Sequence, residues 1–271
     1  MGVRTCPVGT RPSAPVPDPH WLGVVRRFRF FAAMIAGLAM LLPLRLATYR
    51  LAPNGPSRLG MIYIRLLLWG LRIKVYADGP LASEGLIIAN HISWTDILIL
   101  GSCQQAAFVA KSEVRGWPLL GLLARMHGTL FVQREGRGSA QRQVAALAAV
   151  LARGPVILFP EGTTGNGAQV LPFRPTLFAA AAGRTVQPVA IIYRPRNRKW
   201  APGERAAFAW DGDKPFWPHL LTIAAAGPVD CRIVTHRPIR TASADRKELA
   251  AACHRIVCDA HANATSNEDR D

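Results

Sequence analysis

Residues 86–100, LIIANHISWTDILIL, join an apolar strand to a second apolar run through a short polar loop. The loop begins with Asn90 and His91, and Asp96 follows five positions after the histidine. Five residues correspond to about 140° of rotation on a helix, so these two side chains do not share one helix face. If a helix begins near Ser93, the histidine lies in the loop before it and the aspartate in its first turn, close enough to reach the imidazole. A carboxylate on one ring nitrogen fixes the tautomer and leaves the other nitrogen free to accept a proton from a hydroxyl.

The same residues also have a purely structural explanation. Ser93 as the N-cap and Asp96 at the third helical position form a capping pair, which stabilises a helix by about 1 kcal/mol without any catalysis. A histidine and an aspartate at this spacing also occur often by chance. From this stretch alone, a catalytic pair and a helix cap both stay open.

Outward from this stretch, short β-branched runs alternate with segments of helical length. The runs that predict strands are RIKVYA (72–77), LIIAN (86–90), AAFVA (106–110), TLFVQ (129–133), PVILF (155–159), VQPVAIIY (186–193) and DCRIVTH (230–236). Residues 139–153 have an apolar stripe and favour a helix that crosses over the sheet, and residues 245–261 favour a last amphipathic helix. Seven strands interleaved with helices predict an α/β fold around one sheet.

The N-terminal third combines the longest apolar run with strong positive charge. Residues 30–44, FFAAMIAGLAMLLPL, carry no charge and as a helix are about 22 Å long, short of the roughly 30 Å hydrocarbon core of a bilayer. Arg26, Arg27 and Arg29 before the run and Arg45 after it can reach lipid headgroups and lengthen the usable span. The alternative is a buried core helix.

A second apolar helix is predicted over residues 61–73, and a turn-rich segment joins it to the first. Such a pair can lie in or on a membrane surface. We therefore divide the chain into a disordered, proline-rich leader (1–20), a membrane-associated helical pair (21–71), an α/β domain (72–262) and a polar tail (263–271). The leader precedes the apolar run, which argues against a cleavable signal peptide.

Composition bounds the classes of function. Half of the 271 residues are apolar, which excludes a disordered chain, and 33 Lys and Arg against 17 Asp and Glu give a net charge of +16. Anionic partners follow from this charge: nucleic acid, an acidic lipid surface or a phosphorylated substrate. The five cysteines are scattered and form no C-x-x-C pair, which argues against a disulfide scaffold or a zinc module and favours a reducing compartment. We predict no metal site.

Two further stretches carry polar residues directly after a predicted strand. In PVILFPEGTTGNG (155–167), glycine-rich backbone can cradle an anion and Glu161 can orient a hydroxyl, although an ordinary strand-ending turn explains the pattern equally. In GTLFVQREGR (128–137), Arg134 and Arg137 can grip a phosphate, or can be solvated charges.

Taken together and in order, NHISWTD (90–96), GTLFVQR (128–134), FPEGTT (159–164) and VQPVAI (186–191) resemble the four blocks of the glycerolipid acyltransferase family, which includes 1-acylglycerol-3-phosphate acyltransferases. The resemblance covers residues 72 to about 240. It implies an α/β acyltransferase domain with a mixed sheet, docked on a membrane by the N-terminal helical pair. It implies no cofactor, since the acyl donor is a co-substrate, acyl-CoA or acyl-ACP.

The resemblance also assigns roles to single residues. His91 is the expected base and Asp96 its partner. The residues expected to bind substrate are Lys111, Arg134, Glu161, Gly162 and Thr163. The expected location is the cytoplasmic side of the inner membrane, with the lipid bilayer and a lysolipid acceptor as partners.

Two positions depart from the family pattern. Thr164 stands where many phosphatidate-forming members have an arginine, and Pro175 stands where glycine is frequent. FVAKSEVRGWPLLG (108–121) together with FPEGTTGNG (159–167) resembles more closely the bacterial members that acylate lyso-ornithine lipids. We predict lysophosphatidic acid as the acceptor, with lyso-ornithine lipid as the alternative.

Other classes fit less well. The chain contains neither G-x-S-x-G nor H-E-x-x-H, the motifs of serine hydrolases and of zinc proteases. A membrane-attached nucleic-acid-binding protein would explain the charge, but no RNP, zinc-finger or helix-turn-helix signature occurs, and the N-terminal arginines adjoin apolar helices. We therefore predict an acyltransferase that does not bind nucleic acid.

Overall fold

The computed structural model describes residues 20–49, 58–117, 121, 124, 128–132, 138–241 and 245–268. The predicted leader lies outside these residues except for His20, with which the first helix begins. Arg134 and Arg137 also lie outside them.

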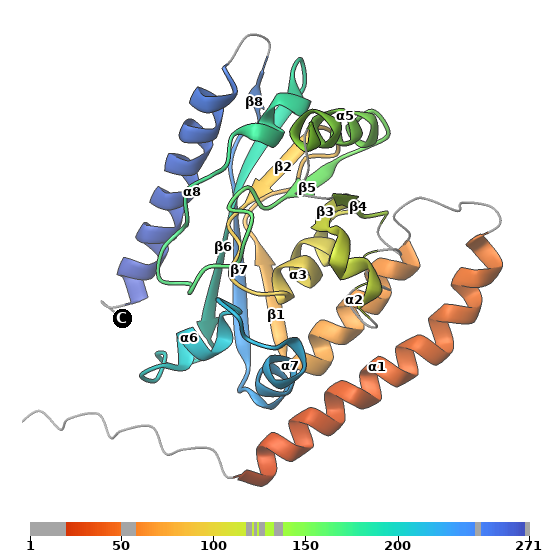
Figure 1. Cartoon of the computed structure of the whole chain (residues 1–271). Coiled ribbons are helices and arrows are strands. Elements are labelled where there is room, and N and C mark those ends of the chain that lie inside the picture. Colours follow the sequence, from red (N-terminus) through yellow and green to blue (C-terminus); the bar gives the residue numbers. More distant parts are fainter. Residues whose placement is uncertain are drawn as a thin grey trace, which may run out of the picture.

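An eight-stranded mixed sheet runs through the centre of the molecule (Figure 1), in the order β1-β7-β6-β2-β5-β3-β4, with β8 beside β6. The strands are β1 (Ile73–Ala77), β2 (Leu86–Ala89), β3 (Ala107–Lys111), β4 (Leu130–Val132), β5 (Val156–Leu158), β6 (Thr185–Pro195), β7 (Val229–Thr235) and β8 (Ile239–Arg240). Strand β6 is antiparallel to β7 and β8, and the other neighbouring strands are parallel. All seven predicted strands form, and the mixed α/β architecture is confirmed.

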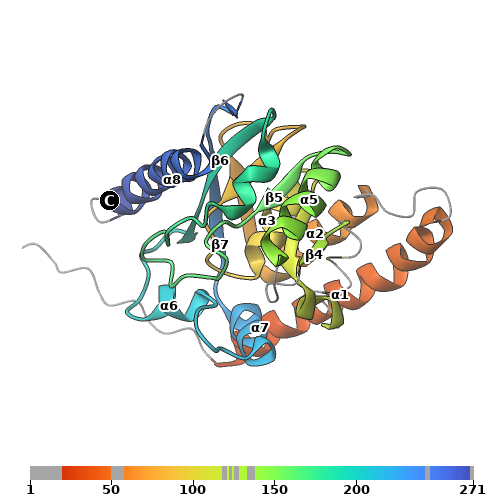
Figure 2. The same ribbon diagram turned by 45° about the horizontal axis from the view of Figure 1, so that its top comes forward.

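Helices cover both faces of the sheet, as Figures 1 and 2 show from two directions. The α-helices are α1 (His20–Tyr49), α2 (Arg58–Leu71), α3 (Thr95–Cys103), α5 (Ser139–Leu151), α6 (Glu204–Phe208), α7 (Phe216–Ala225) and α8 (Arg246–Glu268), and the 3₁₀ helices are η1 (Ser112–Gly116) and η2 (Thr176–Ala181). One core contains residues of α1, α2, α3 and α7, and the other contains residues of α5, η2 and α8. The sheet separates the two cores.

Alternation along β2 shows why its sequence is apolar throughout. Leu86 and Ile88 belong to the α5–α8 core, whereas Ile87 and Ala89 belong to the α1–α3 core. A strand with both faces covered needs apolar side chains at every position. The strand is therefore fixed in the centre of the sheet, and the loop that follows it starts from a rigid position.

Helices α1 and α2 form the predicted N-terminal pair and pack closely at two glycines. A Cβ atom at Gly37 would lie 2.6 Å from the ring of Tyr63, and one at Gly70 would lie 3.2 Å from the backbone of Phe30. The apolar run 30–44 lies inside the longer α1. Over the described residues, no helix combines the length and the apolarity that crossing a membrane requires.

The arginines before the apolar run contact protein groups, although the sequence assigned them to lipid headgroups. Arg26 Nη1 donates to the Ala225 carbonyl at the end of α7 (3.3 Å), and Arg27 Nε donates to another carbonyl of α7 (3.2 Å). Arg29 Nη2 donates to a carbonyl of α2 (2.8 Å). The carbonyls that Arg26 and Arg29 contact are among the last four of their helices, which have no partner within the helix and attract cations. The side chain of Arg45 lies outside the described residues.

Strand β8, helices α6 and α7 and the two 3₁₀ helices η1 and η2 were not predicted, and the last helix is longer than expected. Helix α8 continues past His261 to Glu268, through much of the predicted polar tail. Asp245 precedes the helix, and its side-chain Oδ1 accepts the backbone N–H of Lys247 at 2.6 Å. This is the bond expected of an aspartate at a helix start.

Candidate active site

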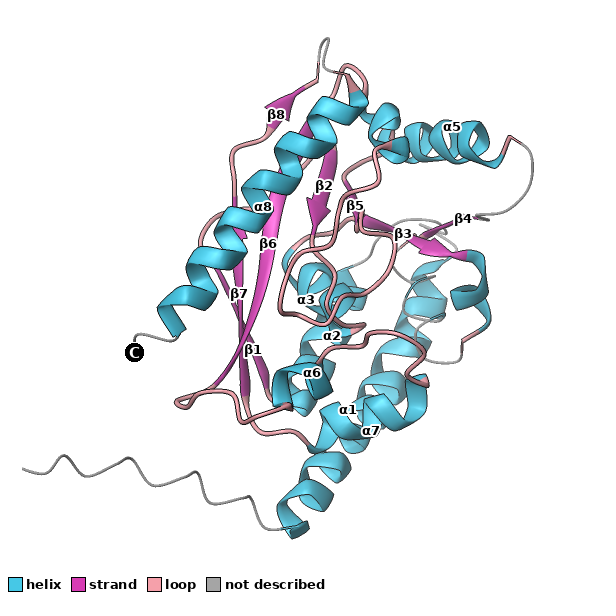
Figure 3. Ribbon diagram, turned by 60° about the vertical axis from the view of Figure 1, so that its left-hand side comes forward, coloured by secondary structure: helices cyan, strands magenta, loops and turns pink. Residues whose placement is uncertain are grey.

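The loops after β2 and β5 meet at one edge of the sheet. The two strands are parallel neighbours, with Leu86 opposite Val156 and Ile88 opposite Leu158. Their carboxyl ends therefore lie side by side, and Figure 3 shows the loops that gather beyond them, next to α3. The two stretches that the sequence singled out, at residues 90–96 and 159–164, thus form one site.

His91 and Asp96 are in direct contact. The imidazole Nδ1 lies 2.8 Å from Asp96 Oδ2, and the aspartate is fully buried. Helix α3 begins at Thr95, so the histidine lies in the loop before the helix and the aspartate in its first turn, as predicted. The contact assigns Nδ1 to the carboxylate and leaves Nε2 for proton transfer.

The carboxylate of Asp96 also holds the loop that carries the histidine. Its Oδ2 accepts the backbone N–H groups of Ile92 (2.6 Å) and Ser93 (2.9 Å), while its Oδ1 accepts the hydroxyl of Tyr193 (2.5 Å). A buried carboxylate with this many donors is held in one orientation. The imidazole beside it is consequently oriented before substrate arrives.

The helix-cap alternative is wrong in its details. The residue at the N-cap is Trp94, without a capping hydrogen bond from its side chain, and the Ser93 hydroxyl has no partner among the described residues. Asp96 does bond backbone amides, but they belong to the loop that carries His91. The Asp96 carboxylate therefore does both: it stabilises the loop backbone and it contacts the imidazole of His91.

Asn90 ties the start of the loop to β6. Its Nδ2 donates to the Ile191 carbonyl (3.0 Å), and its Oδ1 accepts the N–H of the same residue (2.7 Å). The buried amide thus repeats the paired hydrogen bonds of a strand one step beyond the end of β2.

Glu161 holds the backbone of His91 from the other side. Its Oε1 accepts the His91 N–H (2.7 Å) and its Oε2 accepts the Leu171 N–H (3.2 Å), while the His91 carbonyl accepts the N–H of Gly165 (2.8 Å). Burial raises the pKa of Glu161 to about 8. The sequence assigned this residue to substrate, and the structure places its carboxyl group against the protein backbone.

A cavity of about 390 Å³ opens beside the histidine. The ring of His91 stacks on Phe159, with centroids 4.0 Å apart and planes 10° apart. The tryptophans that line the cavity are Trp94, Trp117 and Trp210. The last two are in edge contact, with centroids 5.7 Å apart. The apolar and aromatic part of this lining suits an acyl chain.

Three of the predicted substrate-binding residues, Lys111, Gly162 and Thr163, line this cavity with His91, and Arg134 lies outside the described residues. Lys111 ends β3 and is exposed. Gly162 has φ +72°, and a Cβ atom there would lie 3.1 Å from the guanidinium of Arg174, so glycine suits both the turn and the contact.

Thr164 lines the cavity and joins it to a distant segment. Its hydroxyl donates to the backbone carbonyl of Trp210. The backbone N–H of Trp210 in turn donates to the Ile92 carbonyl at 2.9 Å. The position at which the sequence departs from many phosphatidate-forming enzymes is therefore part of the cavity wall.

Comparison with known proteins gives concordant results. Residues 72–192 match the family model described as Acyltransferase. The chain is 37% identical over 244 residues to the lyso-ornithine lipid O-acyltransferase of Brucella abortus, covering 84% of this chain and 91% of that protein. A protein of the same name from Rhizobium meliloti is 40% identical over 182 residues, covering 62% of this chain and 61% of that one.

Two further proteins are named as acyltransferases of lysophosphatidic acid, the other candidate acceptor. The 1-acyl-sn-glycerol-3-phosphate acyltransferase of Neisseria gonorrhoeae is 39% identical over 125 residues, covering 45% of this chain and 49% of that protein. In fold, the chain resembles the crystal structure of the 1-acyl-sn-glycerophosphate acyltransferase PlsC from Thermotoga maritima, with a TM-score of 0.59 and 19% identity over 90% of this chain and 96% of that one.

Proposed function

We propose that this chain, which belongs to the glycerolipid acyltransferase family, moves a fatty acyl group from an acyl thioester to the hydroxyl of a lyso-ornithine lipid. The observation that supports the chemistry is the contact of His91 Nδ1 with the buried Asp96 carboxylate at the wall of an aromatic cavity. The proposed acceptor is taken from four relatives that are 37–40% identical to this chain over 182–244 residues, all named lyso-ornithine lipid O-acyltransferase. This reverses the order of the two acceptors predicted from the sequence.

The proposed reaction needs one base. His91 Nε2 removes the proton of the acceptor hydroxyl, whose oxygen attacks the thioester carbonyl carbon. The new C–O bond forms, the C–S bond breaks, and the departing thiolate takes the proton from the imidazolium. Asp96 stabilises the positive charge of the imidazolium while it lasts. No bond between acyl group and enzyme is required, because the cavity holds donor and acceptor together.

Thr164 supports an acceptor without a phosphate group. A guanidinium at this position would offer charge-assisted, bidentate hydrogen bonds to a phosphate, and a hydroxyl already bonded to the Trp210 carbonyl does not. Lysophosphatidic acid is the second candidate acceptor, because Lys111 at the same cavity provides a cation for its phosphate.

The test offers the purified protein lyso-ornithine lipid and lysophosphatidic acid in competition, with acyl-ACP or acyl-CoA as donor. We expect the ornithine lipid product to predominate in the wild type, and we expect Thr164→Arg to shift the product ratio toward phosphatidic acid. The matched control is Thr163→Arg, which adds the same charge at the neighbouring cavity position. Predominant phosphatidic acid from the wild type would contradict the proposed acceptor.

We also propose that α1, α2 and α7 place the enzyme on the cytoplasmic surface of the inner membrane. The apolar face, as we name it here, is the set of large exposed apolar residues on these helices: Trp21, Val24, Val25, Phe28, Ile35, Met40 and Leu44 on α1, Ile62 and Trp69 on α2, and Trp217 and Leu221 on α7. An apolar surface of this kind, rimmed by arginines, suits the interface of a bilayer. Acyl thioesters and unpaired cysteines both suit the cytoplasmic side.

Adding two charges to the apolar face tests this placement. Phe28 and Met40 are 75% and 72% exposed, so Phe28→Asp with Met40→Asp leaves the core intact. We expect the double variant to lose most of its flotation with liposomes, because two side chains that would contact lipid become charges that would have to enter the membrane interface. The matched control places two aspartates on the opposite side of the sheet, at the exposed Ala251 and Ala262 of α8 (Figure 1). Equal flotation of the two double variants would contradict the placement.

A further inference from the structure

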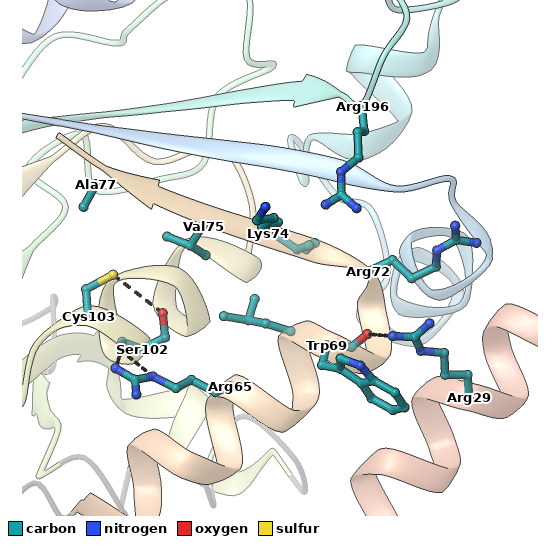
Figure 4. Close-up of a pocket in the computed structure, with 12 residues that line it drawn as sticks. Arg29, Arg65, Trp69, Arg72, Lys74, Val75, Ala77, Ser102, Cys103 and Arg196 are labelled. Carbon is teal, nitrogen blue, oxygen red and sulfur yellow. Dashed lines mark hydrogen bonds between the residues drawn. The ribbon is translucent and has the colours of Figure 1, made fainter.

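A second cavity, of about 590 Å³, lies away from His91 between the N-terminal helices and the edge strand β1. Five of its lining residues are cations, and they come from three parts of the chain: Arg29, then Arg65, Arg72 and Lys74, and then Arg196. None of its lining residues in the described part of the chain is an aspartate or a glutamate. Figure 4 shows Arg65 at one end, beside Ser102, and the other four cations toward the opposite end. We call this hollow the cationic cavity.

Protein partners hold several of these cations in place. Arg65 donates from Nε and Nη2 to the Ser102 carbonyl (3.1 and 2.9 Å), which is a neutral group. Arg29 donates to a carbonyl of α2 and lies 3.8 Å from the ring centroid of Trp69. Arg196 Nε pairs with the carboxylate of Asp230, at 2.7 Å. Five cations and no acidic residue among the described lining residues give the cavity a positive lining, which favours an anion.

The backbone of Arg72 gives an independent reason to assign a role to this cavity. Arg72 follows the last residue of α2 and has φ +62°, in the left-handed region that disfavours every side chain relative to glycine. Glycine is the usual residue at this place after a helix. An arginine held there against its backbone preference points to a function of the guanidinium, which lines the cavity.

The position of the cationic cavity indicates where its ligand comes from. Trp69 lines the cavity and also belongs to the apolar face, with 57% of its surface exposed. A tryptophan that is half exposed and stacked under an arginine suits the headgroup level of a bilayer. A lipid in a membrane that covers the apolar face would present its phosphate at this level.

We propose that the cationic cavity binds the phosphodiester headgroup of an anionic phospholipid in the membrane on which the enzyme lies. This rests on the proposed membrane placement, and it adds a lipid partner that is neither donor nor acceptor. The guanidinium groups of Arg29, Arg72 and Arg196 and the ammonium group of Lys74 supply the donors for the phosphate oxygens. The bound lipid orients the helical pair at the membrane surface.

The decisive variant is Arg72→Gly, which removes the guanidinium and at the same time relieves the left-handed backbone. The variant should therefore fold at least as well as the wild type, as a thermal melt will show. We expect it to bind phosphatidylcholine vesicles that contain phosphatidylglycerol about fivefold more weakly than the wild type does. Binding to vesicles of phosphatidylcholine alone should not change, because the apolar face is intact.

Two matched controls separate the cavity from its backbone and from net charge. Asn197→Gly makes the same backbone change at the other described non-glycine residue with positive φ (+59°), and Arg153→Gly removes one exposed positive charge after α5. Both controls should bind the anionic vesicles like the wild type. If Arg153→Gly and Arg72→Gly lost equal affinity for the anionic vesicles, the effect would be one of net charge and the proposal would be overturned. Unchanged binding of Arg72→Gly to these vesicles would also overturn it.

A competition experiment identifies the source of the anion. Glycerophosphoglycerol, the deacylated headgroup, should displace the wild-type chain from anionic vesicles at concentrations at which inorganic phosphate does not. Equal displacement by inorganic phosphate would overturn the assignment to a lipid. Failure of the membrane placement is recognised separately, because the double aspartate variant of the apolar face would then still float with vesicles of phosphatidylcholine alone.

Discussion

His91→Ala lowers the rate of acyl transfer by about 100- to 10,000-fold, the range expected when a general base is lost. The fold should survive, because the loop is held through the backbone N–H and carbonyl of residue 91, which bond Glu161 and Gly165 and do not depend on the side chain. The measurement is the steady-state rate of product formation, with a thermal melt of the same preparation.

The control for this experiment is His254→Ala, which removes a histidine of α8 that does not line the cavity at His91. It should keep the wild-type rate. A folded His91→Ala enzyme with a near-normal rate would show that another group takes the proton, and the proposed mechanism would have to be abandoned.

Asp96→Asn is expected to lower turnover by a similar factor through a different cause. The amide oxygen can replace Oδ2 and accept the backbone N–H groups of Ile92 and Ser93, while the amide nitrogen donates to the Tyr193 hydroxyl oxygen. The loop geometry can thus persist, and the variant removes chiefly the negative charge that stabilises the imidazolium.

Tyr193→Phe is the companion variant, since it removes one hydrogen bond to Asp96 and keeps the carboxylate. Its rate should fall much less than that of Asp96→Asn. The two rates would be measured together, with the melting temperature of each variant. A larger loss in Tyr193→Phe would mean that orientation of Asp96, and not its charge, governs the reaction.

The pair of His91 and Asp96 was accessible from the sequence because all of its determinants are local. A strand, a loop and a helix start are visible in 15 consecutive residues, and the distance between the two side chains follows from where the helix begins. The strands were predicted equally well, since both faces of the sheet are covered and the central strands are consequently apolar throughout.

The partners of that pair were not accessible, because they depend on the pairing of distant strands. Tyr193 is 97 residues from Asp96 in sequence, and it reaches the carboxylate only because β6 lies beside β2. A tyrosine at the end of an apolar strand gives no signal of this contact. The buried contacts of Glu161 depend in the same way on the β2–β5 neighbourhood.

The interpretation of the N-terminal arginines was incomplete for the same reason. Arg26 and Arg27 bond carbonyls of α7, a short helix that was not predicted. The cationic cavity likewise gathers residues from α1, α2, β1, α3 and the segment after β6, so no single stretch of sequence contains it.

The paired hydrogen bonds between the Asn90 side chain and the backbone of Ile191 have a consequence for motion. They make the loop that bears the base an extension of the central sheet, so the loop and the sheet belong to one cooperative unit of unfolding. A local fluctuation that moved Asn90, the first residue of this loop, would have to break both of these buried hydrogen bonds, which costs free energy. In the proposed mechanism, substrates therefore meet a base whose position is settled in advance, and little of the activation barrier comes from rearranging the protein.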